Sequence, residues 1–203
     1  MKIAVLAVQG AFAEHIDMLK SMGVTCVELR RRTDLEQHFD GLILPGGEST
    51  VQGKLLREFH MLMPLKDRIE NGLPVLGTCA GLILLAQEIG NDDNVYFGTL
   101  PVRVQRNAYG RQLGSFHTEE EVAGVGRVPM TFIRAPYIES LLPAETRCTH
   151  TKQPAQDSAR ILARVDGRIV AVRYVNQIGI AFHPELDEDK RIHRMFLDEC
   201  LSR

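Results

Sequence analysis

The sequence predicts an α/β fold of three layers, in which a mostly parallel central sheet carries helices on both faces and has an antiparallel extension. In the first half, short apolar runs alternate with stretches of helical spacing. In the second half, short β-rich runs are separated by turn residues. The 203 residues, 44% hydrophobic and 25% charged, suffice to bury one good core. We therefore expect a single domain over residues 1–203.

The first half supplies the parallel part of the predicted sheet. Its expected strands are short and apolar, and they cover residues 2–8, 24–29, 41–44 and 73–76. The stretches between them have helical spacing, and they cover residues 11–22, 33–39 and about 51–71. A further apolar stretch after Cys79 has helical spacing up to a stop at Gly90.

The second half supplies the antiparallel extension. An Asp-Gly pair inside Arg164–Arg168, flanked by β-branched residues, predicts a hairpin. The polar stretch 150–159 is expected to be an exposed loop, and a last helix is expected over about 187–201. His193 on that helix is expected to be exposed.

Charge and cysteine content exclude several classes of protein. Lys and Arg number 24 against 26 Asp and Glu, so no basic field attracts nucleic acid or an anionic membrane. The triplet Arg30–Arg32 suits a solvated strand end, with a partner or phosphate contact as the lesser alternative. No apolar run approaches the roughly 18 residues of a membrane span. The four cysteines are scattered without a C-x-x-C pair, which favours a reducing cytoplasm.

Cys79 is the first candidate catalytic residue. The stretch Gly77-Thr78-Cys79-Ala80-Gly81 joins a strand to a helix with the spacing of a nucleophile elbow, G-x-nucleophile-x-G. Such a turn places the thiol at a helix N-terminus, which favours the thiolate. The alternative is a small buried cysteine in a tight strand-to-helix turn, and this stretch alone does not separate the two.

His183 and Glu185 are the candidate base and orienting acid. They end an apolar run in "IGIAFHPELDED", and residues two apart in an extended chain face the same way. Pro184 keeps His183 out of the helical region. A strand end beside an acidic helix cap is the alternative, but its combination with a nucleophile elbow favours a Cys79, His183, Glu185 triad.

The stretch Pro45–Thr50, "PGGEST", is the third element. Pro-Gly suits a type II turn, and Ser49 or Thr50 could cap the next helix. A tight turn without a ligand is the alternative, and the stretch lacks the G-K-[ST] ending of a phosphate loop. Beside the elbow it could supply oxyanion donors, with the N–H groups of Gly47 and Ala80 as candidates.

These elements together resemble a class I, triad-type glutamine amidotransferase, and more narrowly the glutaminase subunits of pyridoxal 5'-phosphate synthase. The blocks that carry the resemblance span nearly the whole chain in the family's order, and they are "LAVQGAFAEH", "LPGGEST", "GTCAGLILLA", "RNAYGRQ", "FIRAP" and "FHPEL". The resemblance implies hydrolysis of L-glutamine to glutamate and ammonia. The ammonia would pass to a synthase subunit, within a large hetero-oligomer, for synthesis of the vitamin B6 cofactor.

The resemblance also assigns residues by motif. Cys79, His183 and Glu185 match the family's triad. The family's glutamine-binding positions are matched by Gly46, Gly47, Glu48, Arg106, Ile133 and Arg134. Gln9 and Gly10 match a loop near the oxyanion hole that responds to the partner. The segments 117–127 and 150–159 follow no such motif.

Other functions share parts of this pattern. A glutaminase serving a different synthase would keep the triad, and a cysteine peptidase of similar architecture could use an elbow cysteine. A non-catalytic regulatory binding protein is the third alternative. The selective motifs and the pair Arg106 and Arg134 favour a small amino-acid substrate. The sequence contains no H-E-x-x-H motif and no compact His/Cys cluster, so we expect neither a metal nor a cofactor.

Overall fold

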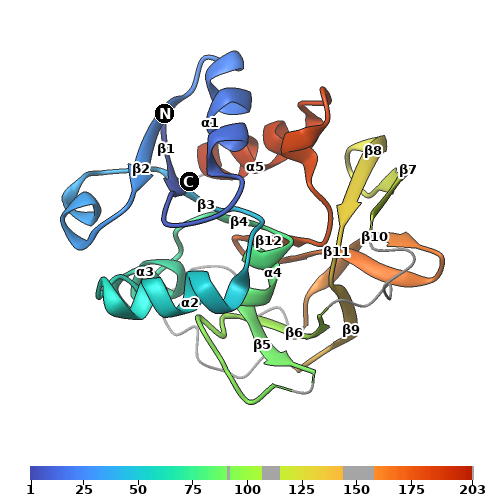
Figure 1. The fold of residues 1–203 in the computed structure, drawn as a ribbon. Coiled ribbons are helices and arrows are strands. Elements are labelled where there is room, and N and C mark those ends of the chain that lie inside the picture. The colour runs from blue at the N-terminus through green and yellow to red at the C-terminus, as the bar shows by residue number, and fades with distance from the viewer. Residues whose placement is uncertain (91, 107–114, 144–157, 203) are drawn as a thin grey trace.

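The computed structural model describes residues 1–90, 92–106, 115–143 and 158–202 (Figure 1). Neighbouring strands in one part of its main sheet are parallel, in the order β2-β1-β3-β4-β12. These strands are β1 (Lys2–Leu6), β2 (Thr25–Leu29), β3 (Gly41–Leu44), β4 (Val75–Thr78) and β12 (Gln177–Ile180). Most of their side chains are buried, as expected when helices cover both faces of a parallel sheet.

The sheet continues from β12 through β11, β9, β6 and β5, mainly by antiparallel pairing. These strands, with β10 paired to β11, are β5 (Ala86–Ile89), β6 (Leu100–Gln105), β9 (Tyr137–Leu141), β10 (Arg160–Val165) and β11 (Arg168–Tyr174). Asp166 and Gly167 join β10 to β11 with φ of 48° and 77°. Two positive φ angles are typical of a type I′ turn, so the predicted hairpin is confirmed.

Helices cover both faces of the parallel part, which confirms the predicted three layers. Figure 1 shows α1 (Phe12–Ser21) and α5 (Arg191–Leu201) on one side, with α2 (Ser49–Glu58), α3 (Leu62–Glu70) and α4 (Ala80–Leu85) on the other. A separate antiparallel hairpin is formed by β7 (Ser115–Val122) and β8 (Gly126–Ile133). Within the described ranges, no helix is long and apolar enough to cross a membrane.

Several predicted helix bounds were wrong. The helix after Cys79 ends at Leu85, and the next four residues form β5, paired with β6. The expected helix over 51–71 is two helices, α2 and α3, interrupted where His60 takes a φ of 53°.

Three further expectations also need correction or lie outside the described residues. The stretch 33–39 contributes only to a 3₁₀ turn, Arg32–Glu36, and the last helix starts at Arg191 after a second 3₁₀ turn, Pro184–Leu186. Of the expected loop 150–159, residues 150–157 lie outside the described residues.

The parallel strands bring the candidate site residues to one edge. Leu44 of β3 is level with Gly77 of β4, and Thr78 is level with Ile180 of β12. The loops after β1, β3, β4 and β12 therefore leave the sheet side by side at the carboxyl ends of the strands. Open α/β sheets bind their ligands at such an edge.

Candidate active site

Cys79 lies in a tight turn between β4 and α4. Its φ of 48° and ψ of −98° are unusual for a residue with a side chain, and such strain is often found at functional positions. The flanking glycines make the turn possible. A Cβ on Gly81 would lie 2.0 Å from the carbonyl oxygen of Leu44, and one on Gly77 would lie 2.8 Å from the Gly81 backbone. The turn therefore has the geometry expected of a nucleophile elbow.

His183 and Glu185 contact each other directly. The Nδ1 atom of His183 lies 2.7 Å from Oε1 of Glu185, and both side chains are buried. The chain at this point is not an extended strand, because Pro184 begins a 3₁₀ turn that contains Glu185. The predicted pair is present, but the turn rather than strand alternation brings the two side chains together.

Electrostatic interactions shift the pKa values of both His183 and Glu185. Burial by itself lowers the pKa of His183, but hydrogen bonds to Cys79 and Glu185, together with their negative charge, raise that pKa to about 10. Burial likewise raises the pKa of Glu185, but His15 and His183 outweigh it and hold that pKa below its usual value. These shifts favour a cationic His183 beside an anionic Glu185.

The loop after β3 packs directly against His183. A Cβ on Gly46 would lie 2.2 Å from Cε1 of the His183 ring, and one on Gly47 would lie 2.5 Å from Oε1 of Gln9. The predicted type II turn was wrong, since Gly46 does not take a positive φ. The predicted side-chain cap was wrong too, because α2 starts after Glu48 without a side-chain capping bond. Close approach, not turn type, explains these glycines.

Gln9 and Gly10 contact this same loop. The backbone N–H of Glu48 donates to Oε1 of Gln9 over 2.9 Å. Gly10 has a φ of 101°, and its Cβ would lie 2.0 Å from the Gly46 carbonyl oxygen. The buried Gln52 donates to the carbonyl oxygens of both Gln9 and Pro45. The loops after β1 and β3 are thus joined beside the elbow.

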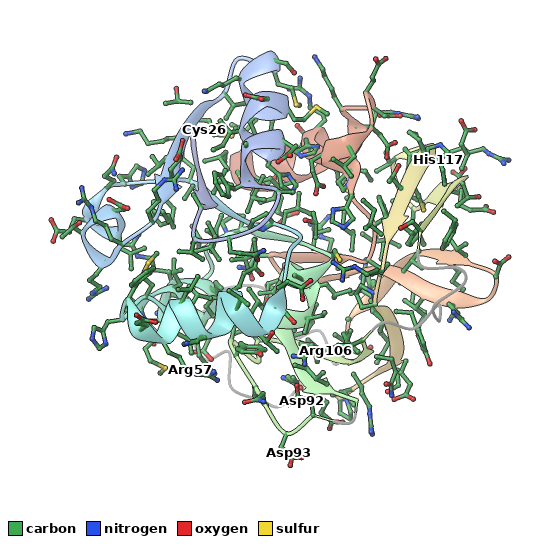
Figure 2. All side chains as sticks on the ribbon, viewed as in Figure 1. Cys26, Arg57, Asp92, Asp93, Arg106 and His117 are labelled. Atoms are coloured by element: carbon green, nitrogen blue, oxygen red, sulfur yellow. The ribbon has the colours of Figure 1, made fainter. Side chains whose placement is uncertain are left out.

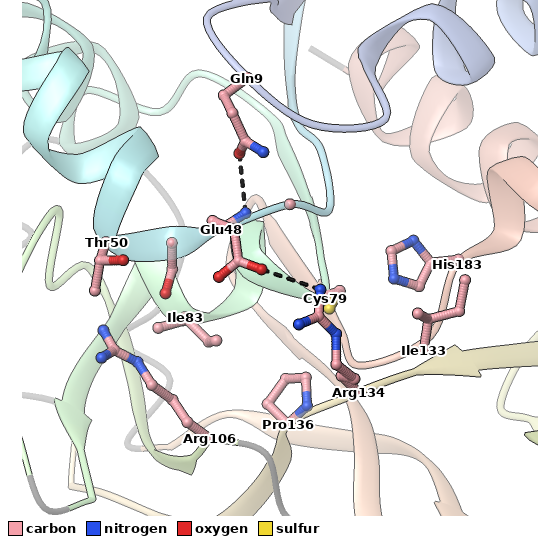
Figure 3. A pocket seen from close by; sticks show the side chains of 12 residues that line it. Gln9, Glu48, Thr50, Cys79, Ile83, Arg106, Ile133, Arg134, Pro136 and His183 are labelled. Carbon is pink, nitrogen blue, oxygen red and sulfur yellow. Dashed lines mark hydrogen bonds and ion pairs between the residues drawn. The ribbon is translucent and has the colours of Figure 1, made fainter. Parts of the chain in front are cut away.

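A cavity of about 390 Å³ opens in front of Cys79 (Figure 3). Its walls come from the loops after β1 and β3, from α4, and from the segments after β6, β8 and β12. Its lining residues are Gln9, Gly47, Glu48, Ser49, Thr50, Cys79, Ile83, Arg106, Ile133, Arg134, Pro136 and His183. Most of the predicted site residues therefore meet in one cavity. Gly46 and Glu185 lie behind it, against His183.

An ion pair lies across this cavity. A guanidinium nitrogen of Arg134 is 3.1 Å from Oε1 of Glu48, and both residues line the cavity together with Cys79 (Figure 3). Both side chains are mainly exposed, and Arg134 has a φ of 43°. The two opposite charges suit a zwitterionic amino acid.

Arg106 lines the cavity from a different position. Its guanidinium lies 2.5 Å from Oδ2 of Asp92 and 3.4 Å from the Tyr96 hydroxyl oxygen. Figure 2 shows Arg106 and Asp92 near β5, away from the ribbon of α1. This carboxylate partner was missed from the sequence, where Arg106 was expected to contact glutamine. The rest of the Arg106 motif, residues 107–112, lies outside the described residues.

Polar residues behind His183 and Glu185 were also missed from the sequence. His15 and His193 are fully buried, so the expectation that His193 is exposed was wrong. His15 lies beside Ile16 and four residues before Leu19, on the buried side of α1. A histidine in an apolar stripe is a signal that could have found it. Among the described residues, no three His, Cys, Asp or Glu side chains form a metal-binding group.

Comparison with known proteins places the chain in a family. The model of the SNO glutamine amidotransferase family matches residues 5–202. A protein of Desulfitobacterium hafniense named pyridoxal 5'-phosphate synthase subunit PdxT is 61% identical over 198 residues, covering 98% of this chain and 92% of that protein. Proteins of the same name from Haemophilus influenzae and Streptococcus pneumoniae are each 51% identical, covering at least 98% of both chains.

Solved structures agree with this placement. A crystal structure of a glutamine amidotransferase is 41% identical and covers 98% of both chains, with a TM-score of 0.86. A structure described as a GMP synthase subunit from Thermoplasma acidophilum, 19% identical with a TM-score of 0.66, shares the fold. It covers 100% of this chain and 94% of its own. With a family match over nearly all of its length and relatives this similar, the chain belongs to the SNO glutamine amidotransferase family.

Proposed function

We propose that this chain is the glutaminase subunit of pyridoxal 5'-phosphate synthase. It hydrolyses L-glutamine to L-glutamate and ammonia and delivers the ammonia to the synthase subunit. The observation that carries the proposal is the meeting of the Cys79 elbow with the hydrogen-bonded pair of His183 and Glu185 in one cavity. Family membership and the name shared by the similar proteins support the same assignment.

The chemistry follows triad logic. The Cys79 thiolate attacks the side-chain amide carbon of glutamine, and the carbonyl electrons move onto oxygen. The N–H groups of Gly47 and Ala80 stabilise that oxyanion. His183 then protonates the leaving nitrogen, so ammonia departs and a glutamyl thioester remains. His183 next takes a proton from water, whose oxygen attacks the thioester and releases glutamate, while Glu185 keeps the imidazole oriented.

Charge complementarity supports the substrate. The glutamine backbone carries a carboxylate and an ammonium group, and the cavity offers Arg134 and Arg106 for the first and Glu48 for the second. Gly46, Gly47 and Ile133 would shape the remaining wall. Both arginines have a carboxylate partner, but Arg134 is the better candidate for the carboxylate contact. Its pair with Glu48 is longer and more exposed than the pair of Arg106 with Asp92, so it is the easier of the two to open.

Released ammonia is used only where an acceptor is present, so we assign the chain to a large hetero-oligomer with the synthase subunit. Gln9 and Gly10 are the partner-responsive loop in this proposal, since Gln9 holds the Glu48 N–H next to the oxyanion donors. We treat residues 1–203 as a single domain, supported by one continuous core cluster. A reducing cytoplasm would suit a free thiol at Cys79.

The test is to combine the synthase subunit, its sugar phosphate substrates and a Cys79→Ala chain with either glutamine or an ammonium salt. We expect ammonium to support pyridoxal 5'-phosphate formation and glutamine not to. The wild-type complex should use glutamine and release glutamate, without cleaving peptides. Cofactor formation from glutamine by the Cys79→Ala complex would overturn the assignment of the nucleophile.

A further inference from the structure

Two fully buried histidines lie behind the triad, outside the cavity. His15 on α1 and His193 on α5 meet with Nδ1 of His15 3.0 Å from Nε2 of His193. The other nitrogen of His15, Nε2, lies 3.1 Å from the Thr78 hydroxyl and 3.4 Å from Oε2 of Glu185. Oε2 has no hydrogen-bond partner within normal distance, whereas Oε1 is bonded to His183. Nε2 of His15 therefore lies beside Oε2, the carboxylate oxygen of Glu185 that is not bonded to His183.

The contacts select one arrangement of protons. If His15 carried its proton on Nδ1, the lone pair of Nε2 would point at the Glu185 carboxylate and repel it. His193 would also bury an unpaired N–H, because its Nδ1 has no partner. With the proton of His15 on Nε2, that N–H can donate to the Thr78 hydroxyl and lies near Oε2 of Glu185, and His193 donates from Nε2 to Nδ1 of His15. Only an unpaired acceptor then remains at Nδ1 of His193, which is a smaller cost than an unpaired donor.

Burial keeps both rings neutral in this arrangement. It lowers the pKa of His15 in spite of the nearby charge of Glu185, and it lowers the pKa of His193 to about 3. The ionisable groups around the pair are Glu185 and His183 on one side and Glu14 on α1. Two neutral rings act on the carboxylate through oriented N–H dipoles and add no net charge to the core.

We propose that His15 and His193 are positioning residues that orient the Glu185 carboxylate, so that Oε1 stays directed at His183. This inference rests on the proposed function, since it concerns the triad that would carry it out. His193 fixes the proton position on His15, and His15 presents an N–H to Oε2. A merely structural pair would be replaceable by apolar side chains, because buried polar groups gain little stability over well-packed apolar ones.

The test uses four variants. His15→Leu removes the N–H and keeps much of the volume, whereas His15→Gln keeps an amide N–H near the position of Nε2. His193→Leu removes the residue that fixes the His15 proton. Leu19→Ala, at another fully buried position of α1, is the control for loosened packing. In each folded chain, the rate of Cys79 alkylation by iodoacetamide is measured against pH, and in each synthase complex, kcat and KM for glutamine are measured.

We expect His15→Leu to lower kcat by roughly tenfold with KM within about twofold, as for one weakened charge-assisted hydrogen bond. Its alkylation midpoint should move to higher pH, because a less firmly held carboxylate stabilises the His183 cation less and the thiolate with it. His193→Leu should shift both quantities in the same direction by less. His15→Gln should recover most of the loss, and Leu19→Ala should keep the wild-type midpoint.

Wild-type midpoints in both leucine variants would overturn the proposal, as would a His15→Gln chain that behaves like His15→Leu. An equal shift in Leu19→Ala would assign the effect to packing and overturn it too. If His15→Leu fails to fold, His193→Leu and His15→Gln decide. Alkylation requires no glutamine, so it reports on the positioning role separately from the proposed function. If the variants show the expected midpoint shifts but the wild-type complex releases no glutamate, the proposed function is overturned and the positioning role is supported.

Discussion

Gly46→Ala tests how closely the loop after β3 controls His183, the proposed catalytic base. The new methyl carbon would lie 2.2 Å from Cε1 and 2.8 Å from Nδ1 of His183, whereas ordinary contact begins at 3.4 Å. The ring and the loop must therefore separate by about 1.2 Å. His183 has little freedom to retreat, because its Nδ1 is bonded to the buried Glu185 at 2.7 Å.

A displacement of this size should be costly for catalysis. Misplacing a catalytic group by about 1 Å can cost on the order of 10²-fold in rate, and we expect a fall of that order in kcat. The loss of one charge-assisted hydrogen bond would also reduce the free energy of unfolding by roughly 1.5–3 kcal/mol. Glutamate release by the synthase complex and urea unfolding of the chain alone measure the two effects.

The matched control is Gly124→Ala in the turn between β7 and β8. Gly124 has a φ of 80°, and no atom lies within 4 Å of the place where a Cβ would stand. Alanine there should cost about 1 kcal/mol of backbone strain and leave kcat unchanged. A Gly46→Ala complex whose kcat stays within twofold of wild type would refute the close packing of this loop on His183.

Three other groups of the site and its surroundings can be tested in the same way. Glu185→Gln should lower kcat by roughly tenfold or more with KM nearly unchanged, because the amide holds the His183 cation less strongly, and full activity in steady-state assays would contradict this. In a chain inactivated at the nucleophile, Arg134→Ala should weaken calorimetric glutamine binding by about tenfold or more and Arg106→Ala by less; unchanged affinity in both would remove these residues from the substrate site. Because His193 has a folded-state pKa of about 3, below its unfolded value of 6.5, its contribution to stability is complete above pH 6.5 and is lost as pH falls towards 3. The free energy of unfolding, measured by urea titration, should therefore fall less steeply with decreasing pH in His193→Leu than in wild type, by about 1.4 kcal/mol per pH unit between pH 6 and 4.5. An unchanged slope would mean that the ring is protonated in the fold.

The local patterns of the sequence were sufficient for much of the fold. Alternating apolar runs and helical stretches predicted the parallel half of the sheet, and the Asp166-Gly167 pair predicted the hairpin. The glycines around Cys79 predicted the elbow, since the sharp turn leaves no room for their side chains. In each case the responsible forces act between residues close in sequence, so a short stretch contains the information.

Tertiary contacts decided the rest. The apolar stretch after Cys79 could continue as a helix, and pairing of β5 with β6 ends it at Leu85. Asp92 engages Arg106, and the fold of α5 against α1 buries His193 beside His15. These outcomes depend on groups brought together from distant parts of the chain, where burial and charge act through space. The sequence by itself predicted which residues would form a triad, and only the tertiary structure decided which buried groups lie behind those residues, because such partners share no local pattern.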